Sequence, residues 1–389
     1  MTTSKDDAPI PAVREPAIDC GGRRSNAGRR GARIAFFGFY GRHNFGDDLF
    51  GYLLQSISLK TPGTLPLIVG ASPARELMHS FHLPIARALW ARSGALGAAA
   101  RAVTYVAAVL RTEASVFGGG SLFGAHASLP FAQLIVNAAR RLHRPVGALG
   151  VSVGPFATTQ RRHAFAFVLK AMSRIAVRDE ASAREVADAT GAVPANLRDL
   201  AFALPALYAP KPRRDERRTL IVSIHLRQYM DAVLAVLAEA DHLRLVDEVL
   251  FVSLDDESVA VTGDIARLFA PSNLTVRRFQ YGDSITEVID LLAAATCVVT
   301  SKLHGAIVSF VYDVPVLLFC YQRKCVEFLL DNDLPGPREA LPDADVCVAH
   351  AIGLLSRNGH DRRYSNAGWH LDQFTQFIGH MAGLDTGTT

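Results

Sequence analysis

The chain has 389 residues, of which 49% are hydrophobic and 20% are charged. These proportions exclude a disordered chain, and the length favours two domains over one core. The formal net charge is only +4, which gives no general argument for nucleic acid as a partner.

The five cysteines include no Cys-x-x-Cys pair, which argues against a disulfide framework and a structural zinc site. We therefore expect a protein of the reducing cytoplasm that holds no metal. No apolar run reaches the roughly 18 residues that a membrane-spanning helix needs. Residues 1–30 contain an arginine-rich stretch, but the apolar segment after it is too short for an export signal. We expect these residues to form a disordered tail.

The chain then alternates between two hydrophobic patterns. The predicted strands begin at Arg33, Thr64, Ala114, Pro145 and Arg174, and the third ends in a glycine loop at 118–121. The predicted helices between and after them cover 47–59, 85–111, 130–144, 160–173 and 180–190. Strands that alternate with helices of about 10–15 residues predict a parallel sheet.

Residues 207–219 carry two prolines and a dense run of charges, and we interpret them as a linker. The alternation then restarts, with predicted strands over 220–228, 247–256, 296–301 and 314–321, and predicted helices over 230–241, 261–270, 284–295 and 305–313. The sequence therefore predicts an α/β protein with two Rossmann-like domains, at 31–206 and 220–345. The last segment, 346–389, is predicted to be mostly helical.

Polar residues gather at the expected carboxyl ends of these strands, where open α/β sheets bind ligands. Taken alone, each has an ordinary structural interpretation: a glycine turn, a helix cap, a surface ion pair or a core histidine. Together they bring several cations to one predicted ligand edge. The residues are Asn44, Gly46, Asp47, Gly118, Gly119, Gly120, Ser121, Arg178, Asp179, Arg227, Lys302, His304 and Lys324.

Five segments carry a family resemblance. They read "GFYGRHNFGDDLF", "VFGGGSLFG", "GVSVGPF", "AVRDEASAREV" and "SKLHGAIVSFVYDVPVLLFCYQRKCVEFL". In this order they resemble the polysaccharide pyruvyl transferase family, over a region from about Arg33 to about Asn332. The resemblance implies two Rossmann-like domains that face each other across a cleft, as in the GT-B fold. The domain at 31–206 would then bind the acceptor and the one at 220–345 the donor.

Enzymes of that family move the enolpyruvyl unit of phosphoenolpyruvate onto a sugar and usually close a cyclic pyruvate ketal. The resemblance implies that Arg178, Lys302, His304 and Lys324 hold the donor, and that Asp47 lies on the acceptor side. We add Asn44 to the acceptor side and Gly119 and Gly120 to the donor side. The position of Lys302 is usually arginine in the family, and lysine keeps the charge but loses the bidentate fork.

The chemistry of the residues agrees with this resemblance. Phosphoenolpyruvate carries a carboxylate and a phosphate, so its site needs several cations close together. We expect His304 to donate the proton to C3 as general acid and Asp47 to take the proton of the acceptor hydroxyl. Arg178, Lys302 and Lys324 would offset the charge of the leaving phosphate. No cofactor or metal is required.

Other hypotheses stay open at this point. A nucleotide-sugar glycosyltransferase of the same fold would need an acidic residue for the ribose, and Glu327 is the only nearby candidate. A non-catalytic scaffold in polysaccharide assembly is the third hypothesis.

For a pyruvyl transferase, the acceptor would be an exopolysaccharide, cell-wall or lipid-linked oligosaccharide precursor in a bacterium. A face with Arg87, Arg92 and Arg101 could then contact the inner membrane, although a solvated helix face is favoured.

Overall fold

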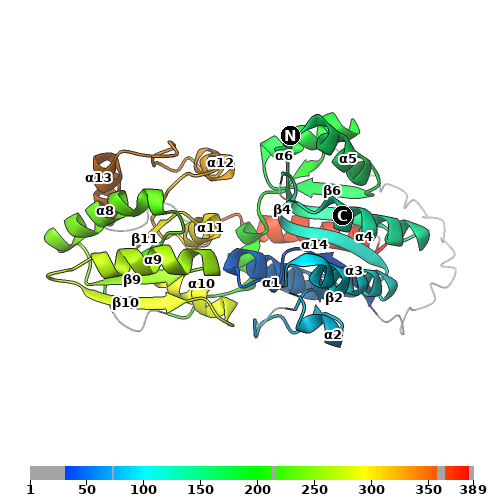
Figure 1. Ribbon diagram of the computed structural model, residues 1–389, viewed down its shortest axis with the longest axis horizontal. Helices are drawn as coiled ribbons and strands as arrows, with labels where there is room; N and C mark the ends of the chain where they lie inside the picture. Colours follow the sequence, from blue (N-terminus) through cyan, green and yellow to red (C-terminus); the bar gives the residue numbers. More distant parts are fainter. Residues whose placement is uncertain are drawn as a thin grey trace, which may run out of the picture. The chain divides into compact units, whose positions relative to one another are not determined.

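The computed structural model describes residues 31–71, 74–90, 92–125, 127–212, 216–356 and 364–384. The tail predicted at 1–30 and three residues of the predicted linker, 213–215, lie outside this part. The described residues form two parallel β-sheets, each with helices on both faces (Figure 1). No helix among them is long and apolar enough to cross a membrane.

The first sheet is built from the segment between residues 32 and 196. Its strands lie in the order β3 (Ser80–Phe81), β2 (Thr64–Val69), β1 (Ala32–Phe37), β4 (Ala114–Phe123), β5 (Val146–Val153), β6 (Arg174–Val177) and β7 (Ala195–Asn196). All neighbouring pairs are parallel. The strand order changes direction between β1 and β4, which places a ligand crevice at the carboxyl ends of these two strands.

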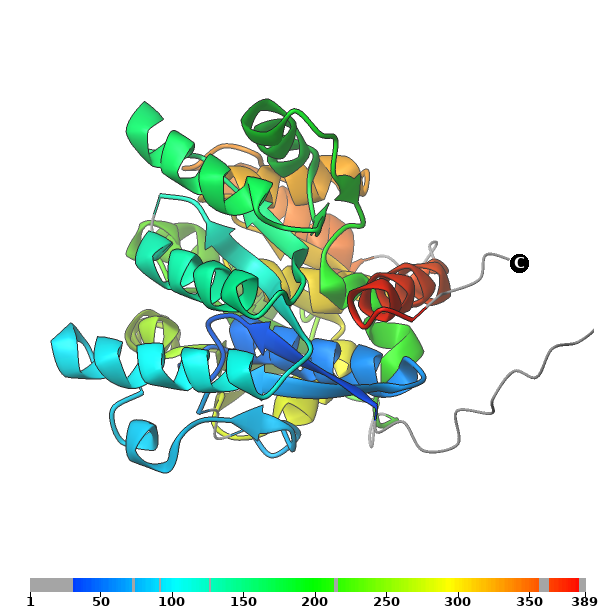
Figure 2. The ribbon, with the colours of Figure 1, turned by 90° about the vertical axis from the view of Figure 1, so that its right-hand side faces the viewer.

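Helices cover both faces of this sheet. One face carries α3 (Gly94–Leu110), α4 (Leu129–Arg141), α5 (Thr159–Lys170) and α6 (Glu180–Thr190), whose buried residues share one apolar cluster (Figure 2). The short α2 (Pro84–Arg87) precedes α3. The other face carries α1 (Phe45–Lys60), the 3₁₀ turn η1 (Leu200–Ala203) and α7 (Leu204–Leu207).

The second sheet has the strand order β10 (Thr275–Gln280), β9 (Glu248–Ser253), β8 (Thr219–Ser223), β11 (Cys297–Thr300) and β12 (Val316–Leu318), again all parallel. One face packs on α8 (Met230–His242), α9 (Asp256–Leu268) and α13 (Ala344–Leu355). The 3₁₀ turn η2 (Arg227–Tyr229) leads into α8. The other face packs on α10 (Ile285–Ala294), α11 (Leu303–Val311) and α12 (Arg323–Asp331), which share an apolar cluster with α1.

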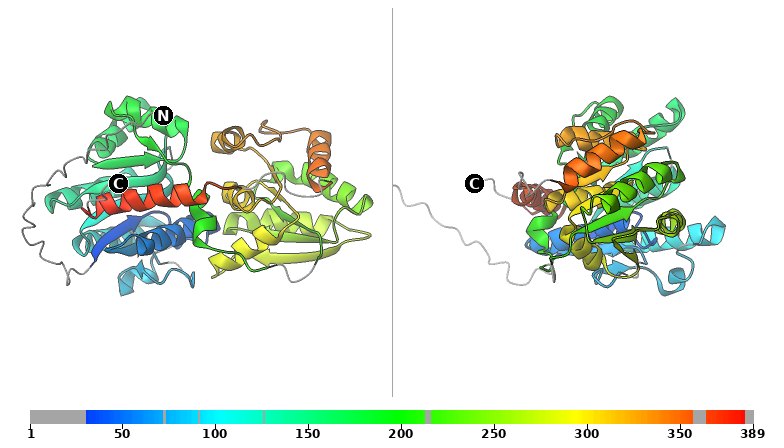
Figure 3. Two further views of the ribbon diagram at one scale, coloured as in Figure 1. Left: turned by 180° about the vertical axis from the view of Figure 1, so that it is seen from behind. Right: turned by 90° about the vertical axis from the view of Figure 1, so that its left-hand side faces the viewer.

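The last helix, α14 (Ala367–Met381), returns to the first sheet (Figure 3). It packs against α1, η1 and α7. The imidazole of His370 lies 3.2 Å from the carbonyl oxygen of Leu197, and the sulfur of Met381 lies 3.8 Å from the hydroxyl of Ser173. The two ends of the described chain therefore belong to the same half of the molecule.

Three local predictions differ from the structure. The glycines at 118–121 belong to β4, which continues to Phe123, instead of forming a loop after the strand. The segment Thr275–Gln280 forms strand β10, which the sequence did not predict because an edge strand is exposed and carries no buried alternation. In the predicted 85–111 helices, Arg101 turns inward and donates to the carbonyl oxygens of Trp90 and Arg92 at 2.6 and 3.0 Å.

Candidate active site

A cavity of about 200 Å³ lies where the switch points of the two sheets meet. From the first sheet it is lined by the segment after β1, the end of β4 and the residue after β6. From the second sheet it is lined by segments after β9, β11 and β12. The polar lining residues are Asn44, Asp47, Ser121, Arg178, Asp255, Lys302, His304, Tyr321 and Lys324.

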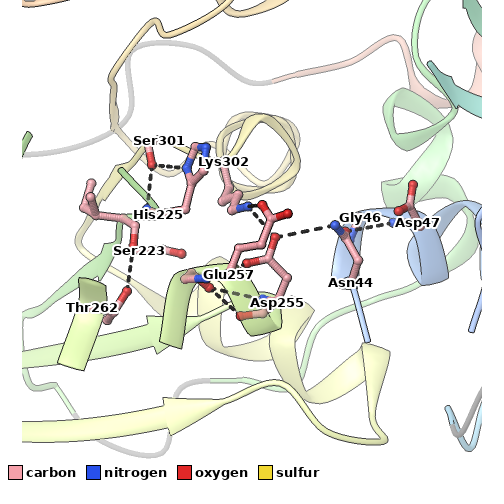
Figure 4. Close-up of polar contacts among 12 residues, drawn as sticks. Asn44, Gly46, Asp47, Ser223, His225, Asp255, Glu257, Thr262, Ser301 and Lys302 are labelled. Carbon is pink, nitrogen blue, oxygen red and sulfur yellow. Dashed lines mark hydrogen bonds and ion pairs between the residues drawn. The ribbon is translucent and has the colours of Figure 1, made fainter. Parts of the chain in front are cut away.

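The segment after β1 is held by Asn44, which caps α1. Its side-chain oxygen accepts from the backbone N–H groups of Gly46 and Asp47 at 3.0 and 3.3 Å. Its amide nitrogen lies 3.5 Å from the Oδ2 atom of Asp255, which follows β9 (Figure 4). Asn44 therefore both starts the helix and links the two sheets at the rim of the cavity.

Asp47 lies in the first turn of α1 and is half-buried. Burial raises the pKa of its carboxyl from 3.8 to about 7, and the neighbouring Asp48 acts in the same direction. Arg42 and Lys324 offset part of this effect. Near neutral pH, Asp47 can therefore either hold or accept a proton, which is the property required of a general acid or base.

His304, in the first turn of α11, lies directly against the first turn of α1. A Cβ atom placed on Gly46 would lie 2.0 Å from its Nδ1 atom, so only glycine leaves room for the imidazole. The ring also meets the Phe50 ring edge to face, at 4.6 Å between centroids. These two contacts with α1 fix the orientation of the imidazole.

The electrostatic setting of His304 disfavours its charged form. Burial lowers its pKa well below the ordinary value, and Arg178, Lys324 and Lys302 lower it further. Its Nε2 atom has no hydrogen-bond partner and lies 3.9 Å from the Oδ2 atom of Asp199. The imidazole is therefore neutral in this setting at neutral pH, and an anion beside it would favour protonation.

Arg178 follows β6, and its side chain is only 5% exposed. Its guanidinium lies 3.5 Å from the carboxylate of Asp179 and 3.4 Å from that of Asp199. Its Nη2 atom is buried and has no hydrogen-bond partner. Asp179 also caps α6 by accepting from the backbone N–H of Ser182 at 2.7 Å. Both side chains of the Arg178–Asp179 pair are buried, so it is not a surface ion pair.

The two lysines of the cavity differ in how their charges are balanced. Lys302 forms an ion pair with Asp255 and lies 3.7 Å from Glu257 (Figure 4). Lys324, at the start of α12, has no carboxylate within ion-pair distance among the described residues. Burial lowers the pKa of Lys324, and the nearby Arg178 contributes to this. The more available positive charge therefore belongs to Lys324.

The glycines of β4 contribute space. Gly119 has a φ of 69°, and a Cβ atom there would lie 2.3 Å from the Phe50 ring. Gly120 has a φ of 78° and lines the cavity, where a Cβ atom would lie 3.8 Å from the Oδ1 atom of Asp47. Gly119 therefore serves packing, and only Gly120 faces the cavity.

The structure brings together most of the residues predicted for the site but not all of them. Arg227 instead pairs with Asp264 at 2.5 Å, away from the cavity. The sequence analysis missed three residues, Asp199, Asp255 and Tyr321. Asp255 and Tyr321 each lie at the carboxyl end of a predicted strand, so the rule used for the other residues would have found them. Asp199 follows the two-residue strand β7, which has no recognisable pattern.

The family assignment rests on the sequence itself. The family model for polysaccharide pyruvyl transferases matches residues 44–323, which is more than half of the chain. The chain belongs to the polysaccharide pyruvyl transferase family. The matched region includes every polar residue named above as lining the cavity except Lys324, which lies one residue beyond it. Among curated protein sequences, none matches this chain.

Solved structures similar to this pyruvyl transferase family member include UDP-sugar enzymes. A Listeria monocytogenes protein assigned as UDP-N-acetylglucosamine 2-epimerase has a TM-score of 0.61 at 12% identity, over 92% of this chain and 98% of its own. The UDP complex of MnaA from S. aureus has a TM-score of 0.61 at 10% identity, over 92% of this chain and 99% of its own. The Neisseria meningitidis UDP-GlcNAc 2-epimerase bound to UDP-GlcNAc has a TM-score of 0.55 at 9% identity, over 90% of this chain and 98% of its own. These identities show only the fold, which is the GT-B arrangement of two Rossmann-like domains.

Proposed function

We propose that the protein transfers the enolpyruvyl group of phosphoenolpyruvate onto a sugar in bacterial polysaccharide biosynthesis and closes a pyruvate ketal. The acceptor would be an exopolysaccharide, cell-wall or lipid-linked oligosaccharide precursor. The reaction would take place in the cytoplasm, without a cofactor or metal. The family membership supports pyruvyl transfer, and the cavity supports a small donor with two acidic groups.

The observation that carries this proposal is the pair of unpartnered nitrogen atoms in the cavity wall. The Nη2 atom of Arg178 and the Nε2 atom of His304 are buried without a hydrogen-bond partner. Both residues line the same cavity as Lys324, whose ammonium has no carboxylate partner among the described residues. A buried donor without an acceptor is costly, and a phosphate with a carboxylate would supply several acceptors.

The proton steps follow from the charges. Two acceptor hydroxyls form C–O bonds to C2 of phosphoenolpyruvate, and the bond from C2 to the phosphate oxygen breaks. Of the two hydroxyl protons that are released, one is balanced by the proton that C3 gains to become a methyl group, and the other by the proton that leaves with the phosphate. The negative charges of the donor would raise the pKa of His304, so that the imidazole is protonated when the donor is bound and can protonate C3. Asp47, with its pKa of about 7, would accept the hydroxyl proton.

The direct test mixes the purified protein with phosphoenolpyruvate and candidate sugar acceptors and measures phosphate release. We expect release only when donor and acceptor are both present, and a loss of about 10²–10⁴-fold in His304→Gln, since general acid catalysis contributes that much. Absence of phosphate release with every acceptor, together with absence of donor binding by calorimetry, would contradict the proposal.

A comparison of melting temperatures with the two donors separates pyruvyl transfer from nucleotide-sugar chemistry. The structural neighbours named above include complexes with UDP and UDP-GlcNAc. In this chain, however, Glu327, the acidic residue considered for a ribose, pairs with Arg323 at 2.7 Å and does not line the cavity that contains His304. We expect phosphoenolpyruvate, and not UDP-GlcNAc, to raise the melting temperature. The opposite result would favour a glycosyltransferase.

A further inference from the structure

The helix-covered face of the first sheet that carries α3, α4 and α5 is built from a segment with very few acids. From Leu77 to Arg178, with both ends included, the chain contains twelve arginines and lysines and one acid, Glu113. Because the whole chain has a formal net charge of +4, the rest of it must carry a net negative charge. The positive charge of the protein is therefore concentrated in this segment.

The outward surface of α3 is apolar. Leu96, Val103 and Leu110 are 68%, 58% and 56% exposed, and their seven-residue spacing places them on one side of the helix. No charged residue stands between them on this side, because Arg101 turns toward the carbonyl oxygens of Trp90 and Arg92. An exposed helix face with three large apolar side chains indicates an interaction surface.

Arginines surround this stripe at both ends. Arg87 and Arg92 precede α3, Arg111 ends it, and Arg140 and Arg141 lie at the end of the neighbouring α4. The Arg144 side chain donates to the carbonyl oxygen of Val109, which holds the ends of α3 and α4 together. The first five arginines are exposed, and none is ion-paired with a residue in the described part of the chain. Leu96, Val103, Leu110 and these five arginines are called the α3 face below.

The α3 face is joined to the candidate active site. The indole nitrogen of Trp90, between α2 and α3, donates to the carbonyl oxygen of Tyr40 at 3.2 Å. Tyr40 follows Phe39, which lines the cavity. A surface that contacts the amino-terminal end of α3 would therefore lie near the acceptor side of the cavity.

We propose that the α3 face docks on an anionic lipid bilayer. Leu96, Val103 and Leu110 enter the boundary between headgroups and acyl chains, and the arginines contact acidic headgroups. The proposal deepens the function proposed above, since a bilayer would present a lipid-linked acceptor to the cavity. The face expected from the sequence, with Arg87, Arg92 and Arg101, thus changes. The Arg101 side chain turns inward and does not belong to it, and the outward side of α3 carries an apolar stripe.

The test measures sedimentation of the full chain with vesicles of phosphatidylcholine, with and without phosphatidylglycerol. We expect binding only to the anionic vesicles, weakened by salt. The double variant Leu96→Glu/Val103→Glu is expected to bind about tenfold or more weakly, because it loses two apolar contacts and adds two repelled charges. The matched control is Leu268→Glu, at a side chain that is 60% exposed on α9 in the second half, and it should bind like the wild type.

Residues 1–30 are present in every variant, so differences between variants report on the α3 face alone. Absence of binding to anionic vesicles, or equal binding by the double variant and the control, would overturn the proposal. So would equally tight binding to soluble polyglutamate, which would indicate an acidic protein partner. Circular dichroism verifies that each variant is folded. Vesicle binding does not require catalysis, so this test can succeed or fail independently of phosphate release.

Discussion

Gly46 is a residue at which the two halves of the candidate site lie against each other. A side chain there would overlap the imidazole of His304, although the helical backbone of α1 itself would accept alanine. The spacing between α1 and α11 therefore depends on one missing methyl group. Such a close approach indicates why a glycine lies beside Asp47 in the first turn of α1.

We predict that Gly46→Ala displaces the His304 imidazole. The variant should lose about 1–3 kcal/mol of stability, as for overpacked sites. If His304 is the acid proposed above, phosphate release should fall about 10²-fold because its imidazole is misplaced. Urea unfolding and the phosphate assay measure these effects. The matched control is Gly263→Ala in α9, where no atom lies within 4 Å of the new methyl group, and it should gain about 0.5–1 kcal/mol. Wild-type activity in Gly46→Ala would contradict the prediction.

Asp47 makes stability depend on pH in a direction opposite to that of most carboxylates. Its pKa of about 7 in the folded protein exceeds the ordinary 3.8, so the folded state binds this proton more tightly than the unfolded state does. The contribution is present below pH 3.8 and is lost as the pH rises through 7. Such a cost is what the catalytic role proposed for Asp47 would require.

We therefore predict that Asp47→Asn is more stable than the wild type at pH 8, by about 1–3 kcal/mol, and loses this advantage near pH 4. Thermal unfolding over this pH range checks the prediction. The neighbouring Asp48→Asn is the control. Asp48 accepts from the Tyr281 hydroxyl at 2.8 Å and the Gly41 N–H at 2.7 Å, so its variant should be destabilised at pH 8. An effect of Asp47→Asn that does not change with pH would show that the ionised Asp47 carboxylate does not destabilise the folded state.

At the scale of elements, the amino-terminal end of α10 is capped by a residue from the other half of the molecule. Glu76 accepts from the backbone N–H groups of Ile285 and Thr286 at 3.1 and 3.0 Å, and from the hydroxyls of Ser284 and Thr286 at 2.9 and 2.7 Å. Burial acts to raise the pKa of Glu76, but the hydrogen bonds from Thr286 and Ile285 outweigh it and lower the pKa. The positive end of a helix favours a carboxylate in this position.

We predict that Glu76→Ala loses about 1–3 kcal/mol of stability at pH 7, since four donors lose their acceptor. A lowered pKa stabilises the folded state above the ordinary pKa of 4.5, so the difference should shrink as the pH falls below that value. Urea unfolding at pH 7 and pH 3.5 measures it. Glu287→Ala, at an exposed carboxylate in the first turn of the same helix, should cost less than about 1 kcal/mol. Equal effects of the two substitutions would exclude Glu76 as a specific cap.

Much of the element pattern could be predicted from the sequence, because buried parallel strands and amphipathic helices leave local periodicities. The edge strand β10 and the inward turn of Arg101 could not, since both depend on what lies beside them in the fold. The same holds within the site. The positions of Arg178, His304 and Lys324 at strand ends could be predicted, whereas the neutralisation of Lys302 by Asp255 required the spatial meeting of β9 and β11.

At the scale of the whole molecule, the return of α14 means that the half containing the first sheet is not continuous in sequence. Leu200 and Phe374, buried in the same cluster, come from segments separated by the entire second sheet. A fragment that stopped at the linker would leave this apolar surface uncovered. The chain therefore crosses twice between the halves. A rigid-body rotation of one half relative to the other would have to take place about both connections at once, which restricts the possible rotation axes.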